Sequence, residues 1–383
     1  MEVYIATAIA LLVFLASVVS VEIALSAAII EIAAGVIAGN FLHLHAPQWM
    51  DFLAGFGGIL LTFLAGAEVD QAVLKNKLKE SILIGGFSFL IPYLAATAYC
   101  YWIAHWTWKA SLIAGCALST TSLAVVYAVL VETGLTATPI GKIIMASTFI
   151  TDIGTAIALS LSFAEWSLNT LWFVAGSALL IILAPRFLPK IFERYGKRVI
   201  EPEIKLLFFL LFALMSLGKW GQSHAVLPVF IFGLMLAPMF HKHRELQRKL
   251  RIVAFAIITP CFFIKGGMNV SLALLAANWG LFLMLFAVKT AGKFIGVWAI
   301  ARHYVKEHAN YTTLLMSTGL TFGTISALYG LQAKYIDASQ FSVLVAVVIA
   351  TAIIPTFIAQ RWFSPELPEE MQEEVMAQEE ESE

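Results

Sequence analysis

The sequence predicts an all-α protein that crosses a membrane many times, and three observations lead to this fold class. Of its 383 residues 60% are hydrophobic and 13% are charged, and the mean hydropathy is +0.85. A soluble domain carries about 25% charged residues. The apolar residues form runs of about 20, the length of a transmembrane helix. The basic residues lie in short clusters between the runs, which gives no sign of a nucleic-acid partner.

The apolar runs predict thirteen helices. In chain order they cover residues 3–20, 22–42, 52–69, 81–104, 110–131, 143–164, 168–188, 204–221, 224–240, 252–268, 271–301, 311–333 and 340–362. Met1-Glu2-Val3 has no basic residue ahead of the first run, so we expect a retained span and not a cleaved signal peptide. The segment 364–383 is rich in glutamate and is expected to be a disordered cytoplasmic tail.

The basic residues give an orientation for this arrangement. With the N-terminus outside, the inward segments hold 18 of the 24 Lys and Arg residues and the outward segments hold 4. The remaining two, Lys289 and Lys293, lie within a span. Cytoplasmic loops of membrane proteins are enriched in Lys and Arg. The charge bias therefore predicts an outside N-terminus and a cytoplasmic C-terminus. The expected location is the plasma (inner) membrane.

Two helices carry similar small polar runs and are expected to break within the membrane. The fifth helix contains Ser119-Thr120-Thr121-Ser122, and the twelfth contains Ser317-Thr318-Gly319. They lie seven helices apart, and an odd offset places two copies in opposite orientations, as an inverted repeat requires. Unwound backbone at that depth is tolerated where it lines a buried or watery site. Ordinary packing of small residues is the alternative.

Asp152 is the leading functional candidate, because it is the one charge between Lys142 and Glu165. A charge at this depth costs at least a few kcal/mol, so it persists where it is paired or functional. Asp152 lies about 15 Å from the inner end of its helix, and Lys293 lies about 14 Å from the inner end of the eleventh helix. Lys289 lies about 20 Å deep. Lys293 is therefore the expected charge partner of Asp152, with Lys289 as the second choice.

A lone buried carboxylate among neutral oxygens suits a hard cation, and protonation would compete with that cation. Thr151 is adjacent, Thr148 lies one turn back at i−4, and Thr121 enters from the break in the fifth helix. We expect these three threonines to supply oxygens to a monovalent or divalent cation bound at Asp152. The alternatives are a purely structural salt bridge for Asp152 and hydroxyls bonded to their own helix for the threonines.

Two further carboxylates are weaker candidates for the ion pathway. Glu31 lies within the second helix and precedes Gly35 and Gly39, a small-residue packing face. Glu68 lies at the inner end of the third helix, beside Asp70. The alternatives are a hydrogen bond to a neighbouring helix for Glu31 and an interfacial position for Glu68. Cys100, Cys116 and Cys261 fit no metal or disulfide spacing, and no nucleophile–base set indicates an enzyme.

Several motifs, in their order and spacing, resemble one known family. They are Glu31–Gly39, Thr62–Asp70, Ser119–Ser122, Thr151-Asp152 and Gly292–Gly296. Together they are similar to the cation:proton antiporters of the sodium/hydrogen exchanger superfamily, specifically the second monovalent cation:proton antiporter family. The likeness runs over essentially all thirteen helices. It implies a homodimer in which Asp152 binds cation and proton alternately and a core domain moves like an elevator.

The resemblance also implies a division of the chain. Residues 1–363 would form the transmembrane antiporter domain. Helices at about 52–164 and 252–333 would give the mobile core, and those at about 3–42, 168–240 and 340–362 the dimerisation scaffold. Members with two adjacent acids at the ion site tend to be electrogenic, whereas Thr151 resembles the electroneutral members. Those members often carry arginine where this chain has Lys293. The nucleotide-binding domain that potassium-efflux relatives append is absent from this chain.

The sequence therefore predicts a secondary antiporter that exchanges Na+ for H+, with K+ and Li+ as alternative substrates. Its expected surroundings are the lipid bilayer and a second copy of the chain, and no cofactor is expected. Two other functions remain open at this point. One is a sodium-coupled symporter of an organic anion with a related fold, which would need a wide polar cavity and paired cation sites. The other is a membrane sensor or channel that transports nothing by exchange.

Overall fold

The protein is helical throughout the residues that its structure describes. The computed structural model describes residues 2–23, 26–69, 77–133, 135, 138–163, 168–195, 201–221 and 225–365. Asp70 and the acidic tail after residue 365 lie outside these ranges. Within them, ten helices are long and apolar enough to cross a membrane, and Ala27–Asn40 and Val226–Phe240 are shorter apolar helices. The described chain is that of a multi-pass membrane protein.

Each predicted range coincides with helical structure, and the first six ranges correspond to seven helices because one range is interrupted. These are α1 (Glu2–Glu22), α2 (Ala27–Asn40), α3 (Gln48–Ala67), α5 (Leu78–Ala98), α6 (Trp108–Ser119), α7 (Leu123–Glu132) and α8 (Pro139–Ser162). A π-helical turn, η1 (Tyr99–Ile103), extends α5. Thr107 and Thr138 begin α6 and α8 by accepting hydrogen bonds from backbone amides, which is the usual way to cap a helix.

The second half of the chain contains more interruptions. Its long elements are α9 (Leu168–Tyr195), α10 (Pro202–Trp220), α11 (Val226–Lys242), α12 (Arg244–Val253), α13 (Thr259–Met268), α15 (Trp279–Lys293), α17 (Ala309–Met316), α18 (Thr321–Gln332) and α19 (Ala338–Trp362). Short elements join them: η3 (Ala254–Ile258), α14 (Leu272–Ala277), η4 (Phe294–Trp298), α16 (Ala299–Tyr304) and η5 (Lys306–His308). Both η3 and η4 are π-helical turns, which the sequence did not reveal.

One helix begins earlier than predicted. The tenth predicted range starts at residue 252, whereas α12 begins at Arg244 and runs through η3 into α13. Leu246 and Leu250 lie one turn apart on α12 and are 7% and 0% exposed, while the charged side chains cover the rest of its surface. An amphipathic first turn extends the helix beyond the apolar core that a hydropathy reading detects.

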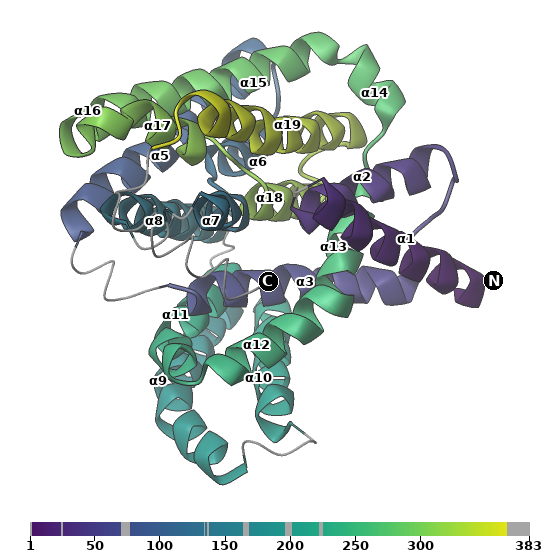
Figure 1. Ribbon diagram of the computed structural model, residues 1–383. Coiled ribbons are helices and arrows are strands. Elements are labelled where there is room, and N and C mark those ends of the chain that lie inside the picture. Colours follow the sequence, from purple (N-terminus) through teal and green to yellow (C-terminus); the bar gives the residue numbers. More distant parts are fainter. Residues whose placement is uncertain are drawn as a thin grey trace.

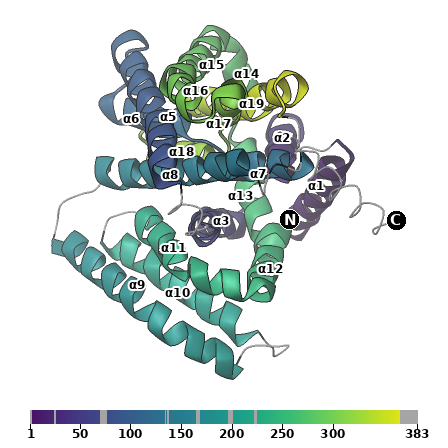
Figure 2. The ribbon, with the colours of Figure 1, turned by 60° about the vertical axis from the view of Figure 1, so that its left-hand side comes forward.

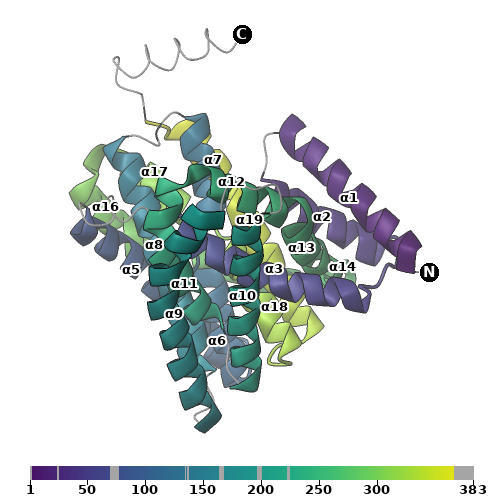
Figure 3. The same cartoon turned by 90° about the horizontal axis from the view of Figure 1, so that it is seen from below.

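The helices form two groups that face one another (Figure 1). One group contains α5 to α8 and α14 to α19, and the other contains α9 to α12, with α3 and α13 between them (Figure 2). Helix α1 lies at the margin beside α2, on the opposite side of the molecule from α9 (Figure 3). Helices α7 and α8 lie in the first group on the side that faces α3 and α11.

Packing groups two helices differently from the division that the family resemblance implies. One buried apolar cluster joins α3 to α9, α10, α11 and α12, through residues such as Phe56, Leu211 and Phe232. Helix α19 contacts α6, α15, α17 and α18. By contact, α3 belongs with the expected scaffold and α19 with the expected core. Whether either group moves remains a prediction.

Two glycine-mediated contacts match one another across the molecule. A Cβ on Gly66 of α3 would overlap the carbonyl oxygen of Phe230 in α11, and a Cβ on Gly233 of α11 would overlap that of Phe63 in α3. Gly35 of α2 and Gly267 of α13 approach each other's backbone in the same way. Only glycine allows so close an approach. Because α13 and α2 are the counterparts of α3 and α11 at the predicted offset of seven helices, the matched contacts support the inverted repeat.

Polar contacts join the same helices near their ends. Asp51 at the start of α3 pairs with Lys265 of α13 at 2.7 Å, and Arg251 of α12 pairs with Glu68, which follows α3, at 3.6 Å. Asn40 Nδ2 at the end of α2 donates to the Val270 carbonyl oxygen at 2.8 Å, and its Oδ1 accepts from the Leu272 amide at 2.9 Å. These bonds fix α2 and α3 against α12 and α13 at both ends.

Candidate functional site

Two interrupted helices cross at the centre of the molecule. Helix α6 ends at Ser119 and α7 begins at Leu123, and α17 ends at Met316 and α18 begins at Thr321. The sequence places both breaks correctly. Backbone and hydroxyl groups join them: Thr121 Oγ1 donates to the Met316 carbonyl oxygen at 2.8 Å. The Ser122 amide donates to Thr318 Oγ1 at 3.3 Å. Each break therefore satisfies polar groups that the other leaves without an intrahelical partner.

Lys293 of α15 holds the first break in place. Its ammonium donates to Ser119 O at 2.7 Å, to Ser88 Oγ of α5 at 2.9 Å and to Thr121 Oγ1 at 3.0 Å. The side chain is fully buried. Ser119 is the last residue of α6, where the helix dipole places negative partial charge, so a cation there is stabilising. Lys293 thus ties α5, α6 and α15 to the crossing point.

The expected ion pair between Asp152 and Lys293 is not formed in this structure. Asp152 lies in α8 and is 2% exposed, and its Oδ1 atom is buried without a hydrogen-bond partner. Among the described residues no ion pair joins it to Lys293 or Lys289. An ammonium has three donors, and Lys293 directs all three at Ser88, Ser119 and Thr121. The two charges therefore share the centre of the molecule without direct contact.

The two threonines next to Asp152 donate to their own helix. Thr148 Oγ1 donates to the Ile144 carbonyl oxygen at 2.9 Å, and Thr151 Oγ1 donates to the Thr148 carbonyl oxygen at 2.7 Å. Both residues are fully buried. This is the backbone bonding that the sequence left open as an alternative. A hydroxyl that donates its proton keeps its oxygen lone pairs, so the bonds leave Thr148 and Thr151 able to coordinate a cation.

Lys289 lies one turn before Lys293 on α15 and faces the second break. A Cβ on Gly319, between α17 and α18, would overlap its Nζ atom. Lys289 is fully buried, and its Nζ has no hydrogen-bond partner within the described part of the chain. The two lysines therefore serve different breaks: Lys293 is bonded to the α6–α7 break, and Lys289 lies against the α17–α18 break.

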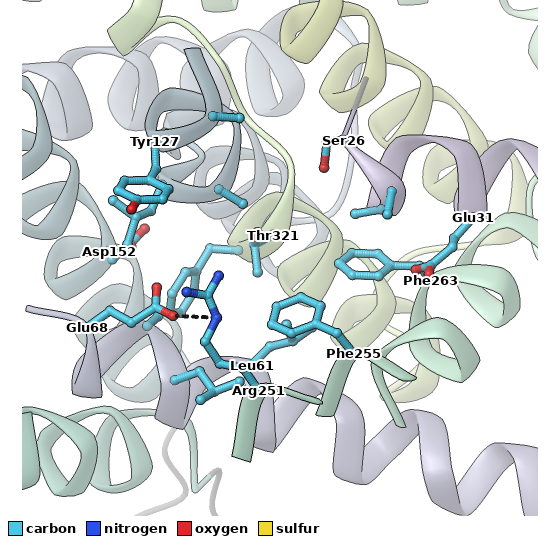
Figure 4. Close-up of a pocket in the computed structure, with 18 residues that line it drawn as sticks. Ser26, Glu31, Leu61, Glu68, Tyr127, Asp152, Arg251, Phe255, Phe263 and Thr321 are labelled. Carbon is cyan, nitrogen blue, oxygen red and sulfur yellow. Dashed lines mark ion pairs between the residues drawn. The ribbon is translucent and has the colours of Figure 1, made fainter. Parts of the chain in front are cut away.

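Asp152 opens onto a cavity of about 480 Å³, called here the Asp152 cavity. Its walls come from α2, α3, α7, α8, α12, η3, α13 and α18, and its charged lining residues are Glu31, Glu68, Asp152 and Arg251. Figure 4 shows Asp152 and Tyr127 on one side of this cavity and Glu31 on the other. The Glu68–Arg251 pair lies between them (Figure 4). The cavity brings together three carboxylates that are far apart in the sequence.

Sequence reasoning missed Arg251 and Tyr127 as lining residues. Arg251 was counted among the inward basic residues, and nothing in its neighbourhood distinguishes it from Arg244 or Arg248. Tyr127 lies in an apolar stretch of α7 and carries no charge. A tyrosine hydroxyl two turns after a predicted helix break is the one available signal, and it is weak.

A second cavity lies beyond an apolar wall. This Lys219 cavity, of about 410 Å³, is lined by parts of α3, α10, α11, α13 and α18, including Lys219, Phe262, Ile325 and Gln332. On α3 it uses residues 54–59, whereas the Asp152 cavity uses residues 61–68, so the two lie toward opposite ends of that helix. Phe263 and Phe322 line the Asp152 cavity, and they share one buried cluster with Phe262 and Ile325.

Comparison with known proteins places these features in context. The family described as "Sodium/hydrogen exchanger, transmembrane" matches residues 7–364. The "Probable Na(+)/H(+) antiporter 3" of Methanocaldococcus jannaschii is 27% identical over 351 residues, covering 86% of this chain and 88% of that protein. The "Na(+)/H(+) antiporter NhaS4" of Synechocystis is 25% identical over 360 residues, covering 85% and 88%.

A solved structure has the same fold. The sodium proton antiporter MjNhaP1 of Methanocaldococcus jannaschii superimposes with a TM-score of 0.67, covering 93% of this chain and 95% of that chain. The two sequences are 16% identical in this superposition, so the likeness is one of fold alone.

Proposed function

This chain belongs to the sodium/hydrogen exchanger family, and from that premise we propose that it exchanges Na+ for H+ across the plasma membrane by alternating access. It is a transporter and not an enzyme. K+ and Li+ are alternative substrates. The observation that carries the proposal concerns Asp152 of α8, a buried carboxylate whose Oδ1 has no hydrogen-bond partner among the described residues and whose side chain opens onto a cavity.

The cation and the proton compete for the negative charge of Asp152, and this competition explains the exchange. An ionised carboxylate enclosed away from water costs several kcal/mol unless a cation or a proton neutralises it. Asp152 therefore takes up one or the other before its part of the protein crosses the membrane. Thr151 occupies the position next to it and carries no charge, so one site carries one positive charge in each direction. This favours an electroneutral cycle of one proton for one monovalent cation.

Thr148 and Thr151 are the nearest neutral oxygens in sequence, and we propose that they coordinate the cation with Asp152. Thr121 has a different role, because its hydroxyl accepts a hydrogen bond from Lys293 and donates one to the carbonyl oxygen of Met316. Lys293 would position both breaks and add a positive field at Asp152 without occupying it. The carboxylate then stays available to the transported ion.

Alternating access is supported by the two cavities and the wall between them. The Asp152 cavity reaches the carboxylate from one end of α3, and the Lys219 cavity stops at Phe262 and Ile325 on the other side. In the orientation that the loop charges favour, the Asp152 cavity opens to the cytoplasm. Movement of the group that contains α8 and α18 relative to α3 and α13 would carry Asp152 past the apolar wall. A homodimer, expected from the family resemblance, would anchor the other group.

The experiment is cation-driven proton exchange in proteoliposomes with an imposed pH gradient. We expect Na+ addition to collapse the gradient in the wild type, and Asp152→Asn to behave like protein-free liposomes because a neutral amide takes up neither ion. Exchange that persists unchanged in Asp152→Asn would overturn the mechanism. In the same vesicles an imposed potential leaves the initial rate unchanged if the cycle is electroneutral, whereas each net charge moved couples about 2.3 kcal/mol per 100 mV.

A further inference from the structure

Glu31 is a second buried carboxylate that the exchange mechanism does not use. It lies in α2, is 4% exposed, and lines the Asp152 cavity. Within the described chain it makes no ion pair and no hydrogen bond. Arg251, the basic residue among the cavity's lining, is paired with Glu68 instead. A buried carboxylate without a partner is neutralised by a cation or by a proton taken up from the cavity.

The position of Glu31 is fixed by close helix packing. It lies one turn before Gly35 and therefore on the same face of α2. Gly35 contacts α13 so closely that a Cβ would overlap the carbonyl oxygen of Ile264, and Gly267 returns the contact. Helix α2 has no freedom to turn Glu31 away without losing this contact. Its carboxylate is thus held at the side of the cavity opposite Asp152 (Figure 4).

The other half of the molecule has no equivalent acid. In the two matched glycine contacts Gly233 of α11 takes the place of Gly35, and four residues before it lies Val229, which is fully buried. The residues that line the Lys219 cavity include one lysine and no carboxylate. The inverted repeat is therefore not kept at Glu31, whose counterpart is Val229. The carboxylate lies at the end of the transport path onto which the Asp152 cavity opens.

We propose that Glu31 forms a second cation site in the Asp152 cavity, which holds a hydrated monovalent cation before it reaches Asp152. Carboxylate oxygen and water are the ligands that hard cations prefer. Because the opposite cavity lacks such a site, the transporter captures cations better from the face onto which the Asp152 cavity opens. This inference deepens the proposed function and rests on it. It predicts that the affinity for the cation differs between the two faces of the membrane. One carboxylate in a symmetric path would give the same affinity on both faces.

The test measures the KM for Na+ on each face separately, in proteoliposomes whose protein orientation has been determined. Glu31→Gln is expected to raise KM on the Asp152-cavity face about five-fold, the effect of one carboxylate on a cation about 4 Å away through water. The KM on the opposite face and the rate at saturating Na+ should stay unchanged. Glu31→Asp, which keeps the charge, should recover most of the affinity.

Glu203→Gln is the matched control. Glu203 of α10 is also a buried acid, 5% exposed with an unpartnered Oε2, but it lines neither cavity. It should leave KM unchanged on both faces. Equal changes on both faces, or none, in Glu31→Gln would overturn the inference while leaving Asp152-dependent exchange intact.

A binding measurement separates failure of this inference from failure of the proposed function. Purified Asp152→Asn protein should still bind radioactive Na+ weakly, and the additional change Glu31→Gln should remove that binding. Matching thermal unfolding of the two proteins shows that both are folded. Equal Na+ binding by the single and double variants would overturn the second site whether or not the wild type transports.

Discussion

At the scale of residues, the contacts of Lys293 depend on the break in α6. In the sequence, a lone charge in an apolar helix singles out Asp152, and depth along the helices selects Lys293 as its expected partner. Depth is only one of three coordinates. Which atoms Lys293 contacts is decided by Ser88 and Ser119, more than 170 residues away in the chain. The break in α6 leaves Ser119 O without an intrahelical partner and free to accept from Lys293.

The two lysines of α15 should respond in opposite ways to removal of their charge. Lys293→Met leaves Ser88, Ser119 and Thr121 without a donor, so we expect the free energy of unfolding to fall by about 2 kcal/mol or more. Lys289→Met removes a buried ammonium that has no partner in the described structure, and it should be neutral or stabilising by about 1 kcal/mol. Thermal unfolding in one detergent compares them, and equal shifts in Tm would contradict this account.

At the scale of elements, the existence of the helices could be predicted from the sequence. The residues at which they end and the π-helical turns could not. The apolar runs are long enough to leave little ambiguity. The breaks after Ser119 and Met316 were predictable because Ser, Thr and Gly compete poorly for helix interiors. The π-helical turns η1, η3 and η4 were not, because they consist of ordinary apolar residues. Their extra residue is set by packing against neighbouring helices, which the local sequence does not encode.

The contact between α3 and α11 should tolerate little added volume. Gly66→Ala places a methyl group on the carbonyl oxygen of Phe230, and we expect it to destabilise the protein by about 1–3 kcal/mol. Gly86→Ala is the matched control, because a Cβ at Gly86 in α5 meets no atom within 4 Å. It should be neutral or stabilise by up to about 1 kcal/mol through helix propensity. Chemical or thermal unfolding that shifts equally in both variants would show that the close contact is unimportant.

At the scale of the whole molecule, packing shows which helices touch, and the division into a mobile core and a dimerisation scaffold stays a prediction. Helix α3 packs into the cluster of α9 to α12, and α19 packs with α15 and α18. Hydropathy is similar in all these helices, so it carries no information about which of them touch. The matched glycine contacts carry more information about which helices touch, because so close an approach needs glycine on both helices. Reading Gly66 with Gly233, and Gly35 with Gly267, predicts that α3 lies against α11 and that α2 lies against α13.

The two cavities predict opposite access from the two sides of the membrane. Ala65 lines the Asp152 cavity and Ile59 lines the Lys219 cavity, six residues apart on α3. A charged, membrane-impermeant thiol reagent should label Ala65→Cys from the cytoplasmic face and Ile59→Cys from the outer face. Background should be low because Cys100, Cys116 and Cys261 are buried. Labelling of both variants from the same side would refute the assignment of the cavities to opposite faces.

The contacts between α2 and α13 also bear on how the protein is made. Asn40 and Val270, which share a hydrogen bond, are 230 residues apart. At roughly 5–20 residues per second, a ribosome needs about 10–45 s to synthesise that interval. During this time α2 has been made, but its glycine face and Asn40 await partners that do not yet exist. Lipid or the insertion machinery must cover them during this time. The nascent protein is therefore most exposed to misassembly and proteolysis while its second half is being synthesised.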